Sequence, residues 1–147
     1  MAGLLDMLAS RYKSATIAFP SLKAVTFAQW LLESGRGTSG LATQHLNFAG
    51  LKWRSEMAGY ATPVQYEASD GPDRYCKFAS VDAFIAGYWR FLSRPPYHGW
   101  EEHAAEGAEA FIHFIGPIFN PAGDVYVDKV LGLLPEAQEL LDDAPAS

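Results

Sequence analysis

The chain has 147 residues, long enough for one domain with a hydrophobic core, and we expect a single domain over 1–147. Its net charge of −6 argues against a nucleic-acid partner, and its apolar fraction of 49% argues against disorder except at the ends. No apolar run approaches the roughly 20 residues of a membrane-spanning helix, so no membrane span is expected.

The first part of the chain is predicted to be helical. Apolar residues recur at helical spacing in three segments, 1–16, 21–33 and 38–45. Ser21 is a candidate cap for the second helix, and either Thr38 or Ser39 for the third. A loop is expected to follow over residues 47–52.

A carboxylate stands in an unfavourable place at the end of the second helix. The run Phe27–Leu32 is apolar except for Gln29, and Ser34-Gly35 ends the helix because glycine accepts a left-handed conformation. Glu33 therefore lies at the negative end of the helix dipole, among side chains that would desolvate it. Both effects favour the protonated form, which a general acid for glycosidic bond cleavage requires. The alternative is a glutamate that ends a helix and faces water.

A β-hairpin is predicted in the middle of the chain. Val64–Glu67 and Arg74–Phe78 flank Asp70-Gly71, a turn signal that Pro72 weakens. The remainder is predicted to be helical over 81–93 behind a Ser80 cap, over 97–115 with a break near Gly107, and over 125–141 in two segments. A loop is expected over 117–123, Asp124 is a candidate cap, and residues 142–147 are expected to form a frayed tail.

Four segments resemble the motifs of one known family, in the same order. They are Ala28-Gln29 with Leu32–Ser39, Leu46–Lys52, Lys77–Ser80 with Tyr88, Leu92 and Arg94–Tyr97, and Asn120–Val130. These are similar to "AQ…LESGxGxS", "NNLFGIK", "F-x-x-Y-x-S…DYxxxL" with "PRYA", and "ATDPNYAxKI" of the bacterial glucosaminidase family (FlgJ-type, glycoside hydrolase family 73). The resemblance covers residues 25–134. It implies a mainly α (α+β) fold, a lysozyme-like helical domain with a small β-hairpin lobe.

The resemblance also implies an activity and a substrate. The chain would be a peptidoglycan hydrolase that cleaves the glycan strand after N-acetylglucosamine, an endo-β-N-acetylglucosaminidase that needs no cofactor. No metal is expected either, because none of the four histidines pairs with another histidine or a cysteine at ligand spacing.

The same resemblance gives roles to individual residues. Glu33 would be the general acid, and Tyr126 would lie near the cleaved bond. Glu67, on the first hairpin strand, would be the second carboxylate, with Glu56, Asp70 and Asp73 as substitutes. The sugar's own acetamide, or a water activated by Glu67, would complete the reaction. Expected substrate-binding residues are Asn47, Phe48, Gly50 and Tyr97.

The sequence departs from the family pattern at several positions. Ala49 stands where the family usually has Phe, Gly87 where it usually has Asp, and Ala83-Phe84 replaces Glu-Ser. These departures leave Glu33 unchanged. They also motivate an alternative in which the chain is a non-catalytic peptidoglycan-binding module. A second alternative keeps the fold but makes the enzyme a lytic transglycosylase or muramidase.

The start of the chain bears on where such an enzyme would act. Residues 1–18 lack the basic start and long apolar centre of a signal peptide. We therefore expect delivery to the cell wall, in the periplasm or outside the cell, by a secretion machine or a phage. An injected effector would be matched by an immunity protein.

Overall fold

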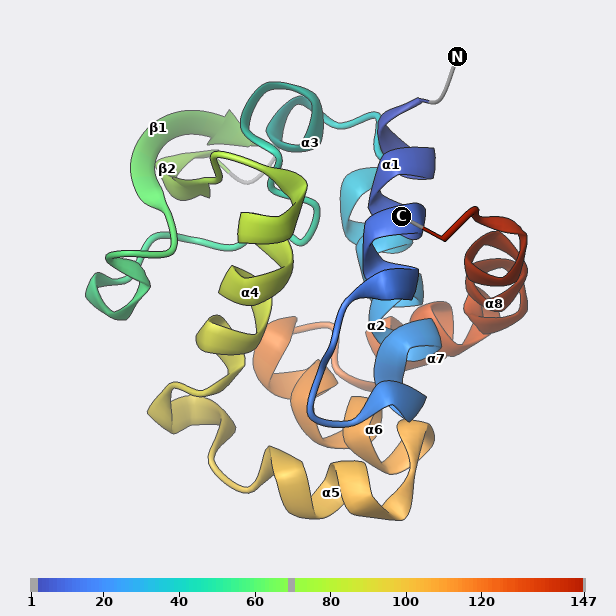
Figure 1. The fold of residues 1–147 in the computed structure, drawn as a ribbon. Coiled ribbons are helices and arrows are strands. Elements are labelled where there is room, and N and C mark those ends of the chain that lie inside the picture. Colours follow the sequence, from blue (N-terminus) through green and yellow to red (C-terminus); the bar gives the residue numbers. More distant parts are fainter. Residues whose placement is uncertain (1–2, 69–70, 147) are drawn as a thin grey trace.

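The computed structural model describes residues 3–68 and 71–146. It is mainly helical with one small antiparallel sheet (Figure 1), which confirms the fold class that the resemblance implies. The elements are α1 Leu4–Ser14, α2 Lys23–Ser34, α3 Gly40–His45, β1 Thr62–Ala68, β2 Gly71–Lys77, α4 Val81–Leu92, α5 Trp100–Glu106, α6 Ala108–Phe119, α7 Asp124–Gly132 and α8 Leu134–Asp143. Short 3-10 turns lie at Pro20–Leu22, Ser55–Met57 and Pro95–Tyr97.

Helix α2 lies at the centre of the hydrophobic core. Trp30 is fully buried, and its ring centroid lies 4.4 Å from that of Tyr12, 4.9 Å from Phe84 and 5.1 Å from Tyr88. Such tilted and edge-on aromatic pairs add to the hydrophobic gain from burial. Since α1 and α4 both contribute rings to this cluster, α2 is fixed from two sides. Ser21 lies within the first 3-10 turn instead of capping α2, which begins at Lys23.

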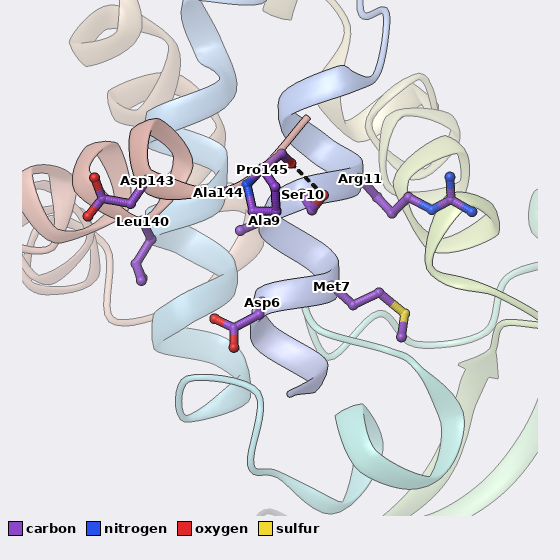
Figure 2. A pocket seen from close by; sticks show the side chains of 9 residues that line it. All are labelled: Asp6, Met7, Ala9, Ser10, Arg11, Leu140, Asp143, Ala144 and Pro145. Atoms are coloured by element: carbon purple, nitrogen blue, oxygen red, sulfur yellow. Dashed lines mark hydrogen bonds between the residues drawn. The ribbon is translucent and has the colours of Figure 1, made fainter. Parts of the chain in front are cut away.

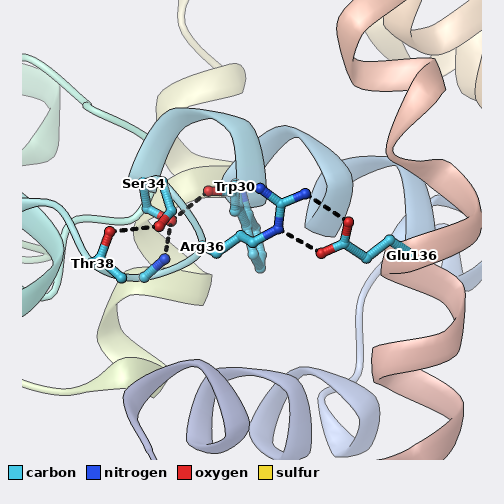
Figure 3. Close-up of polar contacts among 7 residues, drawn as sticks. Trp30, Ser34, Arg36, Thr38 and Glu136 are labelled. Atoms are coloured by element: carbon cyan, nitrogen blue, oxygen red, sulfur yellow. Dashed lines mark hydrogen bonds and ion pairs between the residues drawn. The ribbon is translucent and has the colours of Figure 1, made fainter.

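The loop after α2 is held by side-chain and backbone hydrogen bonds (Figure 3). Gly35 has φ +56°, the left-handed conformation expected at the helix end. The Ser34 hydroxyl donates to the Trp30 carbonyl at 2.7 Å and accepts from the Gly37 N–H at 2.8 Å. Arg36 forms a two-pronged ion pair with Glu136 of α8, with both N···O distances 2.7 Å. These contacts fix the last turn of α2, which carries Glu33.

The predicted β-hairpin is present. Strands β1 and β2 pair antiparallel, with Thr62 opposite Lys77 and Ala68 opposite Gly71. The hairpin and α3 lie together at one end of the molecule (Figure 1), where Tyr66 packs edge-on against His45 with ring centroids 6.0 Å apart. Asp70, half of the expected turn, lies outside the described residues.

The predicted caps of α3 and α4 are confirmed. The Ser39 hydroxyl accepts from the Ala42 N–H at 3.2 Å, and the Ser80 hydroxyl accepts from the Ala83 N–H at 3.0 Å. At α7 the expectation differs by one residue, because Asp124 is the first helical residue and Gly123 occupies the cap position.

The expected loop over 117–123 is shorter in the structure. Helix α6 continues through Pro117 to Phe119. Proline has no N–H, so the helix continues there although the hydrogen bond to the carbonyl four residues earlier is missing. The predicted break near Gly107 is present, since Gly107 has φ +124° and separates α5 from α6.

The C-terminal residues differ from the frayed tail expected over 142–147. Asp142 and Asp143 belong to α8, and Ala144 and Pro145 after them are held against α1, while Ser147 lies outside the described residues. Lys13 Nζ donates to the backbone carbonyls of Asp142 at 2.9 Å and of Ala144 at 2.8 Å, and the Ser10 hydroxyl donates to that of Pro145 at 2.6 Å (Figure 2). Among the described residues, no helix is long and apolar enough to cross a membrane.

Candidate active site

Glu33 projects from the last turn of α2 into a partly buried setting. Its side chain is half-buried, and Tyr126 of α7 lies beside its carboxylate. Burial raises the pKa of Glu33, and interaction with the Tyr126 hydroxyl partly offsets that rise. Desolvation therefore acts in the direction that the sequence pattern predicts, toward a proton held on the carboxyl group.

Gly50 approaches the Glu33 carboxylate from the loop between α3 and β1. Its φ of +64° places it in the left-handed region, and a Cβ built on it would lie 3.6 Å from Glu33 Oε1. Glycine suits this position for two reasons. It takes the left-handed conformation without steric cost, and it leaves room beside the carboxylate.

A chain of buried polar side chains leads from the core to Glu33. Gln29 lies one turn before Glu33 on α2, is fully buried, and accepts a hydrogen bond from the Tyr88 hydroxyl. The Tyr126 hydroxyl interacts with both Gln29 and Glu33, and burial together with the Glu33 charge raises the pKa of Tyr126 far above its ordinary value. Tyr126 therefore remains a neutral hydrogen-bond donor at any working pH.

Neither Gln29 Nε2 nor the Tyr126 hydroxyl has a well-aligned hydrogen-bond partner within residues 3–68 and 71–146. Buried polar atoms normally do have one, and exceptions often mark sites that a ligand completes. Tyr126, which lines a pocket together with Glu33, thus retains donor capacity for a bound molecule.

Two pockets lie near Glu33. One, of about 250 Å³, is lined by Leu32, Glu33, Asn120, Ala122, Val125, Tyr126 and Lys129. The other, of about 320 Å³, is lined by Gly50, Lys52, Arg54, Phe91, Arg94, Pro96, Tyr97, Ile118 and Phe119. Because Gly50 lines the second pocket and lies against Glu33, the carboxylate stands where the two pockets approach each other. Such an arrangement suits a chain-like ligand that extends to both sides of the acid.

The structure brings four of the predicted site residues into this region. Glu33 and Tyr126 line the first pocket, Gly50 and Tyr97 line the second, and Tyr97 is close enough to Tyr126 to affect its ionisation.

Asn47 and Phe48 require a correction, because they cannot contact a substrate as predicted. Their exposed fractions are 1% and 0%. The Asn47 amide donates to the Leu51 and Cys76 carbonyls, both at 3.0 Å, and accepts from the Leu51 N–H at 3.0 Å. Phe48 packs against Phe84 with ring centroids 5.1 Å apart. These two residues shape the loop that presents Gly50.

The alternatives for a second carboxylate lie on or near the hairpin. Glu67 is exposed on β1 opposite Pro72, and no described contact joins it to Glu33. Asp73 forms an ion pair with Lys52 at 3.3 Å, and the Arg74 backbone N–H, followed by Lys52, lowers the pKa of that carboxyl. Glu56 lies in the 3-10 turn before the hairpin. Among the described residues, the carboxylate beside Tyr126 is Glu33 alone.

The sequence assigns no role to two residues of this region. Gln29 interrupts an apolar run and belongs to a family motif, and its spacing of four residues from Glu33 puts both on one helix face. Arg94 also belongs to a motif that gives it no role. It is 8% exposed, and a buried arginine in a pocket wall is a signal that requires the fold to be seen.

The departure at Gly87 has a packing reason. A Cβ at this position of α4 would overlap the Phe78 ring, so the aspartate usual in the family does not fit here. Phe78 takes up that space and contacts Phe84 edge-on, with ring centroids 5.4 Å apart. The change is therefore coupled to the core and does not affect the carboxylate of Glu33.

Comparison with known families supports these observations. The glucosaminidase family, described as mannosyl-glycoprotein endo-beta-N-acetylglucosaminidase, matches residues 9–137, which include every residue of both pockets. No curated protein and no solved structure matched the chain in the same set of comparisons. The chain belongs to the glucosaminidase family and is a glycoside hydrolase of the endo-β-N-acetylglucosaminidase type.

Proposed function

We propose that this enzyme cleaves the glycan strand of peptidoglycan after N-acetylglucosamine, with Glu33 as the general acid. The observation that carries the proposal is the setting of Glu33, where burial raises the pKa of a carboxyl group that lines one pocket and lies beside Gly50, which lines a second. A glycosidase acid must hold a proton at working pH and release it to the leaving oxygen.

The proposed reaction begins with proton transfer from Glu33 to the glycosidic oxygen. The bond from that oxygen to the anomeric carbon of N-acetylglucosamine breaks, and the leaving sugar departs with a new hydroxyl group. Tyr126, held neutral by burial, is placed to stabilise the Glu33 carboxylate that remains. This residue therefore favours the form of Glu33 that is left after proton transfer.

The position of Glu67 bears on which group completes the reaction at the anomeric carbon. Because Glu67 is exposed on the hairpin and makes no described contact with Glu33, we favour attack by the sugar's own acetamide oxygen, followed by water. A water activated by Glu67 is the alternative, and it requires the hairpin to approach the cleft when substrate binds.

The same observation supports a second candidate, a lytic transglycosylase. An enzyme with one well-placed carboxyl group could also form a 1,6-anhydro sugar by internal attack, without adding water. Mass spectrometry of digested sacculi separates the two reactions. Fragments with N-acetylglucosamine at the reducing end support a glucosaminidase, whereas 1,6-anhydromuramic ends would overturn it in favour of the transglycosylase.

We further propose that the enzyme acts in the periplasm or outside the cell after delivery by a secretion machine or a phage. Expression with an added export signal should lyse a bacterial host, and expression without one should be harmless. Toxicity restricted to the cytoplasmic form would contradict a wall substrate. If the delivery is by injection, a small exported neighbour protein should bind this chain and block hydrolysis.

A further inference from the structure

The second of the two pockets is basic, although the chain as a whole is acidic. Of the 11 lysines and arginines in the sequence, three line this pocket: Lys52, Arg54 and Arg94. We call it the Arg94 pocket. It shares Gly50 with the surroundings of Glu33, so a ligand group bound in it would belong to a molecule that also reaches the acid.

Arg94 is the most buried of these cations, with an exposed fraction of 8%. Its guanidinium carbon lies 3.8 Å from the centre of the Phe91 ring, and its Nε donates to the Phe91 carbonyl at 3.1 Å. Stacking and this one hydrogen bond fix the plane of the guanidinium group. Within residues 3–68 and 71–146, neither terminal nitrogen of Arg94 forms a hydrogen bond or an ion pair.

The other groups around the pocket do not neutralise Arg94. Lys52 shares its charge with Asp73, while Arg54 donates to the carbonyl of its neighbour Trp53. Burial raises the pKa of Tyr97 to about 12, so this phenol is neutral at physiological pH. Glu56 influences Arg94 only from beyond ion-pair distance.

Neither terminal nitrogen of Arg94 is fully enclosed by the protein, so both are open to an anion that enters the pocket. The surrounding protein desolvates the guanidinium group in part and lowers the pKa of Arg94, so an anion bound there would stabilise the charge. The planar fork of terminal nitrogens matches the two oxygens of a carboxylate. In a glycan strand of the proposed kind, carboxylates occur on the lactyl groups of peptide-free muramic acid and on the peptide stems.

We infer that the Arg94 pocket is a subsite for a carboxylate carried by the muramic residue next to the cleaved bond, with Arg94 as its main ligand. This inference rests on the proposed function and makes it more specific. The enzyme would recognise an acidic substituent of the strand as well as its sugars.

The test compares one set of glycan strands in three forms. Peptide-free strands carry lactyl carboxylates, the same strands after carbodiimide amidation carry none, and strands with stems carry the peptide carboxylates. One of the two acidic forms should be recognised by the pocket. For that form we expect a KM that is about tenfold or more below the KM for amidated strands. A lactyl ligand gives this preference on peptide-free strands, and a stem ligand gives it only on strands with peptides.

The variant Arg94→Met keeps an apolar stem over Phe91 and removes the charge. It should raise the KM of the acidic form to that of the amidated form and leave kcat unchanged. Arg54→Gln, at an exposed position, should raise the same KM by a smaller factor. Arg11→Gln, on α1 and paired with Asp82, removes the same charge away from the pocket and should leave KM unchanged.

Equal KM values of the parent enzyme for acidic and amidated strands would overturn the carboxylate subsite while leaving the proposed function intact. A loss of kcat on both forms in Arg94→Met, with Arg54→Gln unaltered, would also overturn it. Failure of the parent enzyme to cut any of the three strands would instead overturn the proposed function.

Discussion

The Tyr126 hydroxyl lies beside the Glu33 carboxylate and lowers the pKa that burial raises. The two residues come from α7 and α2, almost a hundred positions apart in the chain, and both line the same pocket. Their opposing effects set the pH range over which Glu33 can act as an acid.

Replacing Tyr126 by phenylalanine should shift the pH dependence of cleavage. A general acid must be protonated, so activity falls as pH rises through the pKa of Glu33. Without the hydroxyl, the pKa of Glu33 should rise further, and the alkaline limb of the kcat/KM profile should move to higher pH. Tyr60→Phe, at an exposed residue on the loop before β1, is the matched control. An alkaline limb that stays in place or moves to lower pH would show that Tyr126 does not stabilise the carboxylate.

Replacing Glu33 by glutamine should make stability less dependent on pH. In the unfolded chain a glutamate ionises near pH 4.3, and in the folded protein the pKa of Glu33 is higher. Between the two values the folded state holds more protons, so the free energy of unfolding falls as pH rises, and the cost is complete above the folded pKa. Glutamine bears no such cost.

We therefore expect Glu33→Gln to match the parent in stability near pH 4 and to exceed it increasingly as pH approaches 7. Denaturant unfolding at several pH values measures the difference. Glu139→Gln, at an exposed position of α8, should follow the parent throughout. A difference between parent and Glu33→Gln that is constant with pH would contradict a raised pKa at Glu33.

Gly50→Ala should impair both stability and activity, for separable reasons. The left-handed φ of +64° should cost about 1–2 kcal/mol of unfolding free energy, and the new methyl group would fill the space 3.6 Å from Glu33 Oε1, in van der Waals contact with it. Gly59→Ala provides the control, because Gly59 has φ +91° and open space around it. Both variants should lose stability, but only Gly50→Ala should have a lower kcat. Equal kcat values in the two variants would show that Gly50 is not part of the active site.

Gly87→Ala should destabilise the core. Its Cβ would overlap the Phe78 ring, and overpacking of this kind costs about 1–3 kcal/mol. Gly132→Ala, at the end of α7 with nothing close to the new atom, should be neutral or stabilising. Urea unfolding compares the two, and in Phe78→Leu, which shortens the side chain facing Gly87, the penalty of Gly87→Ala should shrink. A Gly87→Ala protein as stable as the parent would mean that Phe78 can shift aside at no cost.

Much of the fold could be predicted because local signals agree with the tertiary structure. Ser39 and Ser80 cap the helices that follow them, Gly107 separates two helices, and the hairpin forms where the turn signal stands. The predictions of local structure fail where contacts between distant parts of the chain determine the conformation. Helix α6 continues through Pro117 to Phe119, and residues 142–145 are held by Lys13 and Ser10, from the other end of the chain.

The candidate site was predictable in part for a related reason. Glu33 could be identified because a carboxylate after Trp30–Leu32 conflicts with its surroundings in the sequence itself. The burial of Asn47 could not be predicted, since an asparagine in a loop looks the same whether it faces solvent or bonds the backbone inside. The free guanidinium of Arg94 depends on the loop carrying Gly50, more than forty residues earlier in the chain.

The most direct test of the central claim is the rate of peptidoglycan cleavage by Glu33→Gln. Purified sacculi are incubated with parent, Glu33→Gln and Glu139→Gln proteins at equal concentration, and the release of soluble reducing sugar is followed. Loss of the acid should slow cleavage by about 10²–10⁴-fold, with sacculus binding and folding retained. Glu139→Gln should cleave at the parental rate. A Glu33→Gln protein that releases sugar as fast as the parent would contradict the assignment of Glu33 as the general acid.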